Sequence, residues 1–276
     1  MTLPNPVPIG ACAGCVLAGQ SGLHDPARTE KIAALLYSLF SYLFFLLTFV
    51  YLMGFLGNVV VPKSIDSGPG LAWPWALVVD VLLITVFALQ HSIMARKSFK
   101  RRWCRVIPPV IERATYVLAS SVVLALMCWL WQPIDISVWS VQSPVLAGVL
   151  TTVYWLGWGL LLVATFLLSH FELFGVKQPL DKLRLPKPVN NVFRTPALYK
   201  VVRHPMYLGF LIAFWVTPEM SVGHLVFALT STIYILIGTQ LEEKDLVELF
   251  GDKYRDYQKS VGMLLPNLRR KSGSGR

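Results

Sequence analysis

Several ionisable side chains stand at the ends of long apolar segments, where their types and spacing could carry out chemistry. They are His91, His170, Glu172, Arg203, His204, Glu242 and Glu243. Histidine can act as a general acid or base near neutral pH, and a glutamate near an arginine can bind a ligand that carries both charges. Each group alone could simply bond a lipid headgroup or an interfacial backbone group. Four chain segments that bring such groups to one membrane level favour a shared pocket.

The segment Arg203 to Gly209 reads RHPMYLG and has the features of a helix start that could bind an anion. Proline is well tolerated at the first helical position, so we expect a helix to begin at Pro205. The free N–H groups in the first turn of this helix, together with Arg203, would bind a carboxylate. Glu242 or Glu243 could hold an ammonium or sulfonium close by, although both could instead pair with basic loops. The two helix ends together would suit a zwitterionic amino-acid group with an extra positive charge.

The adjacent glutamates should not be equivalent. Neighbouring residues on a helix point about 100° apart, so only one of them can face a single ligand. We favour Glu242 as the residue that holds the ligand and expect Glu243 to meet a basic group or water.

The elements that must position these groups are membrane spans. The chain has 276 residues, of which 55% are hydrophobic and 14% charged, whereas soluble domains have about 25% charged residues. Its mean hydropathy is +0.57. The apolar residues form blocks of about 20, the length a helix needs to cross a bilayer. This composition excludes a water-soluble domain and predicts an all-α, polytopic integral membrane helix bundle.

Hydropathy predicts helices at about 34–57, 74–93, 114–132, 145–169, 205–217 and 221–240. The fifth has only about 13 residues before Pro218, too few for a full crossing, so we expect five or six spans. The tail from Leu241 to Val261 has apolar residues at three- and four-residue spacing, which predicts an amphipathic C-terminal helix on the cytoplasmic membrane surface. It could cover a site that opens there.

The charge pattern predicts the orientation. The formal net charge is +10 from 25 Lys and Arg against 15 Asp and Glu, and Lys63 is the one basic residue expected in a loop on the opposite side. Cytoplasmic loops retain positive charge, so we expect a multi-pass protein of the bacterial inner membrane with both termini cytoplasmic. The basic loops would attract anionic lipid headgroups, and we expect no nucleic-acid partner.

We expect one membrane domain over residues 31–266, between a flexible leader at 1–30 and a disordered basic tail at 267–276. The leader lacks the pattern of a cleaved signal peptide, so the first span would direct insertion. Cys12 and Cys15 have no second pair of ligands, so we expect no metal site. We also leave His224 out of the site because it falls at the opposite membrane face. The oligomeric state stays open.

These motifs resemble the superfamily of isoprenylcysteine carboxyl methyltransferases and nurim-like membrane proteins. The likeness rests on the Arg-His-Pro-x-Tyr-x-Gly helix start, a Glu-Glu pair about 35 residues later and the aromatic tail FGDKYRDYQKSVGMLLP. Within the superfamily, FALQHSIMARKSFKRRW, PPVIERATYVL, SHFELFG and FRTPALYKVVRHPMYLGFLIAFWVTPEM resemble the bacterial methanethiol S-methyltransferases. The resemblance covers about residues 30–266.

The resemblance implies S-adenosyl-L-methionine as methyl donor, bound from the cytoplasmic side. The implied donor site contains Tyr199, Arg203, His204, Pro205, Tyr207, Gly209, Glu242 and Glu243. The implied reaction is the attack of a small volatile thiol, methanethiol, on the donor methyl group to form dimethyl sulfide.

A thiolate is the nucleophile, so the site must remove the thiol proton. His91, His170 and His204 are the candidate bases, and we rank the first two higher because we expect His204 to bind the donor. Four alternatives remain open. The acceptor could be another thiol, a prenylcysteine-type carboxylate or a lipid headgroup, or the protein could be a non-catalytic carrier with histidines that bind haem or metal.

Overall fold

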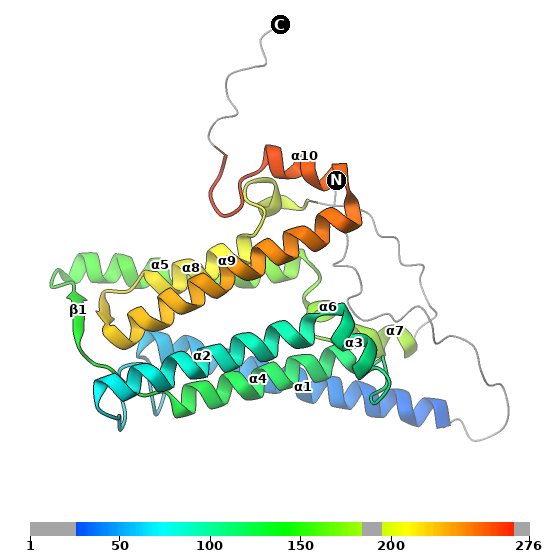
Figure 1. Ribbon diagram of the computed structural model, residues 1–276, viewed down its shortest axis with the longest axis horizontal. Coiled ribbons are helices and arrows are strands. Elements are labelled where there is room, and N and C mark those ends of the chain that lie inside the picture. The colour runs from blue at the N-terminus through cyan, green and yellow to red at the C-terminus, as the bar shows by residue number, and fades with distance from the viewer. Residues whose placement is uncertain (1–25, 184–194, 268–276) are drawn as a thin grey trace, which may run out of the picture.

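The computed structural model describes residues 26–183 and 195–267, which form a bundle of long helices (Figure 1). The helices are α1 (Pro26–Gly57), α2 (Trp73–Ala95), α3 (Lys97–Trp103), α4 (Glu112–Leu130), α5 (Pro144–Leu167), α6 (His170–Leu173), α7 (Lys177–Leu183), the 3₁₀ turn η1 (Ala197–Lys200), α8 (Pro205–Trp215), α9 (Val222–Phe250) and α10 (Asp252–Ser260). The strands are β1 (Ser137–Ser140) and β2 (Glu219–Ser221). Cys12, Cys15 and residues 268–276 lie outside the described residues.

Among the described residues, five helices are long and apolar enough to cross a membrane: α1, α2, α4, α5 and α9. Their outer faces expose large apolar side chains such as Leu43, Leu47 and Leu156, as expected for surfaces in contact with lipid. The predicted polytopic helical membrane protein is therefore confirmed. We predicted five or six spans, and the structure has five helices long enough for a full span. The predicted segment 205–217 forms the short helix α8.

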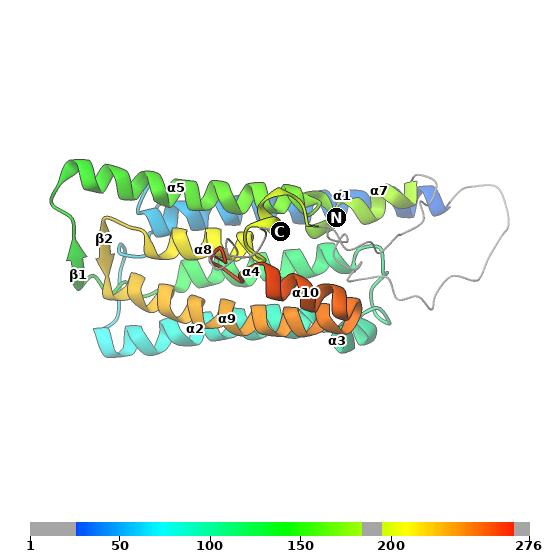
Figure 2. The same ribbon diagram turned by 90° about the horizontal axis from the view of Figure 1, so that it is seen from above.

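The short helix α8 decides where the last span ends. α1 begins, and α2, α5 and α9 end, at the end of the bundle that also holds α3, α6 and α7, whereas both strands lie at the other end (Figure 2). α8 begins partway along the bundle and runs from there to the strand end. Five full spans plus this partial one bring the end of α9 to the end of the bundle where α1 begins.

The packing of α8 against α5 depends on two glycines. A Cβ on Gly209 would lie 2.7 Å from the Gly157 carbonyl oxygen and 2.9 Å from the Leu161 nitrogen. A Cβ on Gly157 would lie 3.0 Å from the Gly209 carbonyl oxygen. The two backbones touch where small residues allow it, as is common between membrane helices. This contact holds α8 and the residues that precede it in place.

The C-terminal region differs from the prediction. The helix predicted to end near residue 240 continues to Phe250, and the chain then turns at Gly251, whose φ of +58° favours glycine. α10 follows, and its buried Tyr254 and Tyr257 pack against Leu246 and neighbouring residues on α9. The predicted amphipathic helix is thus α10 together with the last turns of α9. Hydropathy alone missed the true end because the last turns of α9 are polar.

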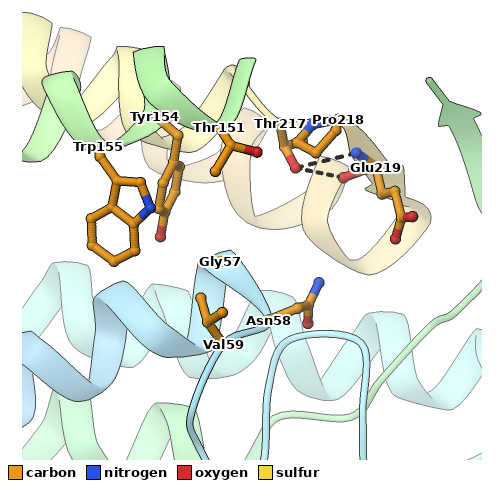
Figure 3. A pocket seen from close by; sticks show the side chains of 9 residues that line it. All are labelled: Gly57, Asn58, Val59, Thr151, Tyr154, Trp155, Thr217, Pro218 and Glu219. Carbon is orange, nitrogen blue, oxygen red and sulfur yellow. Dashed lines mark hydrogen bonds between the residues drawn. The ribbon is translucent and has the colours of Figure 1, made fainter. Parts of the chain in front are cut away.

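The strand end of the bundle holds a separate set of contacts. β1 pairs with β2 in antiparallel register, with Trp139 opposite Met220. His224 is fully buried there, and its Nε2 bonds the Phe214 carbonyl. A cavity of about 240 Å³ opens at the same end, lined by residues of α1, α5 and the α8–β2 connection (Figure 3). Glu219 is the one carboxylate in its lining, and none of the lining residues is a histidine or cysteine.

Candidate active site

Glu243 is the centre of a polar cluster that joins α8, α9 and α10. Its Oε1 accepts a hydrogen bond from Arg203 Nε at 2.7 Å and contacts His204 Nε2 at 3.0 Å. Its Oε2 accepts from Arg203 Nη2 at 3.3 Å and from Gln258 Nε2 at 2.8 Å. Only 13% of the side chain is exposed. Both carboxylate oxygens are therefore bound by protein groups, and Glu243 holds the cluster together.

Glu242 has a different environment one position earlier. Its Oε2 accepts the Tyr207 hydroxyl at 2.8 Å and lies 3.9 Å from His204 Nδ1. Its side chain is 46% exposed, so the carboxylate can still accept a hydrogen bond from a ligand. The predicted inequality of the two glutamates thus corresponds to a clear difference in geometry. Glu242 is the one that can face a ligand.

The guanidinium of Arg203 is bound by protein groups. We expected it to help bind a ligand carboxylate; in the structure it donates to Glu243 and, through Nη1, to the carbonyls of Gln258 at 3.0 Å and Val261 at 2.5 Å. Because planar guanidinium groups form such fixed sets of hydrogen bonds, Arg203 ties α9 and the C-terminal segment to the start of α8. Its role in the structure is to position the cluster.

The helix that begins at Pro205 confirms the sequence prediction. Pro205 is the first residue of α8 and His204 is its N-cap residue. The backbone N–H groups of Arg203 and His204 donate to the carbonyls of Gly262 and Met263, so the C-terminal segment secures this entry. The His204 ring stacks on Tyr207 at 5.4 Å. The positive end of α8 therefore lies next to Tyr207 and Glu242.

Tyr199 lies under the same cluster. Its side chain is buried, and its carbonyl accepts the Tyr257 hydroxyl at 2.5 Å. Burial raises the pKa of Tyr199, and the nearby Glu242 and Tyr257 raise it further. Tyr199 consequently stays a neutral phenol. It contributes a polar but uncharged wall beside Glu242.

Gly209 lies at a helix contact. The resemblance places it in the donor site, and the structure shows its close contact with Gly157 of α5 described above. That contact leaves no room for a larger residue. Sequence reasoning could not distinguish the two roles, since both require a residue without a side chain.

His91 lies in a second polar group. Its Nε2 bonds the Tyr116 hydroxyl at 2.7 Å, and its Nδ1 contacts Ser120 Oγ at 3.2 Å. Tyr234 of α9 lies edge-on at 6.4 Å between ring centroids. α9 also carries Glu242, about two turns after Tyr234.

His170 lies elsewhere. Its Nε2 bonds the Tyr42 hydroxyl of α1 at 2.8 Å, and its Nδ1 contacts Thr165 Oγ1 of α5 at 2.8 Å. Phe166 stacks on the ring at 4.3 Å, and Phe174 packs beside it at 4.8 Å. Burial lowers the pKa of His170 and favours the neutral ring. The structure therefore does not bring His170 together with the other candidate bases.

Glu172, the remaining acid from the sequence pattern, has a local partner. It accepts a hydrogen bond from Lys177 Nζ at 2.8 Å. Within the described residues, no three His, Cys, Asp or Glu side chains are grouped so that they could hold a metal ion.

Sequence reasoning missed several residues of the site. Gln258 binds Glu243, and Tyr116, Ser120 and Tyr234 surround His91. A signal for two of these was present, because residues four apart on a helix share a face and Tyr116 and Ser120 have that spacing. Gln258 and Tyr234 come from α10 and α9, and only the tertiary fold brings them here.

Comparison with known proteins places the chain among its relatives. Residues 80–242 match the family model described as NnrU protein. The chain is 75% identical to a methanethiol S-methyltransferase of Pseudomonas deceptionensis over 91% of this chain and 96% of that protein. It is 47% identical to a methanethiol S-methyltransferase of Mycobacterium tuberculosis over 86% and 97% of the two chains. It is also 29% identical to nurim of Danio rerio over 68% and 71%.

No solved structure matches the chain. The family model spans more than half of the chain, and the bacterial relatives align over nearly their whole length. The resemblance seen in the motifs is therefore confirmed: this chain belongs to the NnrU protein family, within the group that includes the methanethiol S-methyltransferases.

Proposed function

We propose that this protein is a membrane enzyme that methylates a small thiol, converting methanethiol to dimethyl sulfide with S-adenosyl-L-methionine as methyl donor. The proposal is supported by relatives named methanethiol S-methyltransferase at 47% to 75% identity. The structural observation that carries it is the half-exposed Glu242 next to the positive end of α8.

The charges of the donor fit this arrangement. S-adenosyl-L-methionine carries an ammonium, a carboxylate and a sulfonium. Glu242 would accept the ammonium, and the first-turn N–H groups of α8 would bind the carboxylate. The faces of Tyr207 and Tyr199 would attract the sulfonium, because aromatic rings are negative on their faces. His204 contacts both glutamates and would hold Glu242 in position for the donor. Pro205 starts α8 at this point.

The thiol would react beside His91. Its proton must leave as the sulfur attacks, and His91 is bonded by the Tyr116 hydroxyl and lies against Tyr234 of α9, the helix that carries Glu242. A pocket that excludes water favours the approach of a thiolate to the sulfonium, because the two opposite charges neutralise each other in the transition state. An apolar volatile thiol can reach such a pocket through the lipid. We therefore assign the role of base to His91, and neither to His170 nor to His204.

We further propose that the protein lies in the bacterial inner membrane with the donor site facing the cytoplasm. The basic residues of the α2–α4 connection and of α10 support this orientation. Residues 31–266 would form the single catalytic domain, with both termini cytoplasmic. Reporter fusions at both termini test the orientation. A terminus that activates a periplasmic reporter would contradict it.

A headspace assay tests the reaction. Purified protein in detergent is given methyl-labelled donor and a panel of acceptors: methanethiol, larger alkanethiols, a prenylcysteine and a lipid headgroup. We expect labelled dimethyl sulfide from methanethiol. Donor binding without transfer to any thiol would contradict the proposed acceptor, and transfer to the prenylcysteine alone would point to a carboxylate acceptor. A protein that binds no donor in calorimetry would contradict the proposal as a whole.

A further inference from the structure

The way in which the thiol proton leaves depends on a residue that neither the motifs nor the comparisons single out. Both ring nitrogens of His91 are engaged by hydroxyl groups, Nε2 by Tyr116 and Nδ1 by Ser120. A thiol therefore cannot bond His91 directly without displacing one of them. The oxygen of Tyr116 has further lone pairs, so it can accept a proton while it donates its own to Nε2.

Tyr116 and His91 lie beside α9, the helix that carries Glu242. The Tyr234 ring of α9 lies edge-on to His91 at 6.4 Å between ring centroids, and the Tyr234 hydroxyl accepts a hydrogen bond from Ser92 Oγ at 3.4 Å. Tyr234 precedes Glu242 by about two turns of the same helix. Phe87 stacks on the His91 ring at 5.5 Å.

Two cations lie over the Tyr116 ring. The guanidinium carbon of Arg113 is 5.1 Å from the ring centroid, and Lys100 Nζ is 6.0 Å from it. Arg113 is held by a hydrogen bond from Nε to the Leu173 carbonyl at 2.7 Å. Lys100 is 3.9 Å from Glu112, and both side chains are almost fully buried. Positive charge at this position stabilises negative charge that develops on the tyrosine oxygen.

We propose that Tyr116 is a catalytic residue that takes the proton of the thiol and passes its own proton to His91. This inference rests on the proposed thiol methylation. As the thiol sulfur forms its bond to the donor methyl group, the S–H bond breaks and its proton moves to the Tyr116 oxygen. The Tyr116 proton moves to His91 Nε2, and the electron pair of the broken methyl–sulfonium bond stays on the donor sulfur. The positive charge passes from the sulfonium to the imidazolium, which later returns the proton through Tyr116.

The local charges decide how this step should depend on pH. The titratable or charged groups that face Tyr116 and His91 are Glu112 and Arg113 of α4, Lys100 of α3, Tyr234 of α9 and Tyr207 of α8. Burial and the neighbouring Arg113 lower the pKa of Lys100 to about 8. Lys100 is therefore mostly charged near pH 6 and loses its charge as the pH approaches 8.

The test compares thiols that share a two-carbon skeleton and differ in acidity. Tyr116→Phe removes one hydroxyl, and Tyr42→Phe is the matched control because Tyr42 makes the same bond to His170. Methyl transfer is measured for each variant with ethanethiol and with the more acidic trifluoroethanethiol between pH 6 and pH 8, and donor affinity is measured alongside.

A lost proton acceptor lowers the rate by about 10²-fold or more. We expect that loss for Tyr116→Phe with ethanethiol, a loss below about tenfold with trifluoroethanethiol, and unchanged donor affinity. His91→Gln should show the same dependence on thiol acidity, and Tyr42→Phe should keep nearly full activity with both thiols.

An equal loss with both thiols at every pH would overturn the inference, since Tyr116 would then only position other groups. Full activity of Tyr116→Phe would overturn it as well. The wild-type protein separates this failure from that of the proposed function: if it transfers no methyl group to either thiol or to methanethiol, the proposed reaction itself is wrong.

Discussion

The His91 and His170 regions are built alike at short range and differently at longer range. In each, a tyrosine hydroxyl bonds Nε2, at 2.7 Å from Tyr116 and 2.8 Å from Tyr42. In each, a Ser or Thr hydroxyl contacts Nδ1. Around His170 the next layer consists of phenylalanine rings, whereas around the His91 pair it contains Arg113, Lys100 and Tyr234.

This difference teaches that the direct partners of a histidine do not identify its role. A histidine between two hydroxyls can join helices or move a proton. Charge close to its partner, and a second polar cluster within reach, decide which of these it does. His170 joins α1 to α5, and in our proposal His91 serves the reaction.

The largest expected effect separates the two histidines. His91→Ala should lower turnover by about 10²- to 10⁴-fold, because it removes the final proton acceptor. His170→Ala should change turnover by less than about threefold but lower the melting temperature, because it opens the contact between α1 and α5. Turnover and thermal melting of both variants check this. Equal losses of turnover at normal stability would break the comparison.

The two glutamates beside the His91 region should separate ligand binding from stability. Glu242→Gln should weaken donor binding by about 3 kcal/mol, roughly 150-fold, because the donor ammonium loses its charged partner. Glu243→Gln should lower the free energy of unfolding by about 3 kcal/mol, because Arg203 keeps a buried charge without its carboxylate. Calorimetry and thermal melting of each variant distinguish these effects. Small and equal effects on donor binding would mean that neither glutamate holds the donor.

A smaller effect is expected at the glycine contact that holds α8. Gly209→Val should cost about 1–3 kcal/mol of stability through overpacking against Gly157 and Leu161. Gly238→Val is the matched control, because a Cβ there meets nothing within 4 Å. Donor affinity of the folded Gly209 variant should stay within about threefold of wild type if the glycine serves packing. A loss of donor binding at unchanged stability would show that Gly209 contributes to the donor site and not only to packing.

The smallest expected effect is a loss of stability at acidic pH that depends on His170. Burial lowers the folded-state pKa of His170 below 6.5, so the unfolded chain binds more protons than the folded one as the pH falls through that value. Stability from this site is fully present above pH 6.5 and is lost below it, by at most about 1.4 kcal/mol per pH unit. His170→Asn should flatten the melting temperature between pH 5 and pH 7. The same acid dependence in wild type and variant would assign it to another group.

The sequence already contained much of the fold, because the relevant signals are local. A block of about 20 apolar residues can satisfy its backbone in lipid only as a helix, so the five long spans follow from composition. Proline at the first helical position predicted the start of α8 at Pro205. The end of α9 escaped prediction because its last turns lie beyond the apolar block and are held by packing against α10.

Part of the candidate site could also be predicted from the sequence. Residue types and their distance from a helix end placed His91, His204, Glu242 and Glu243 near one another. The structure brings His204 into contact with both glutamates, and it places His91 against Tyr234 of the same helix that carries them. Sequence also indicated that the two glutamates must differ, since adjacent residues on a helix point in different directions. That much follows from helix geometry alone.

Only the tertiary structure decided which glutamate is buried, that Arg203 is bound by protein groups, that Gly209 faces α5 and that His170 stands apart from His91. The physical reason is that a helix can turn about its axis without any change in its own hydrogen bonds. Which face it presents depends on how neighbouring helices pack against it. In a bundle whose outer surface is apolar all round, hydrophobic periodicity does not reveal that rotation, and the contacts between helices determine it.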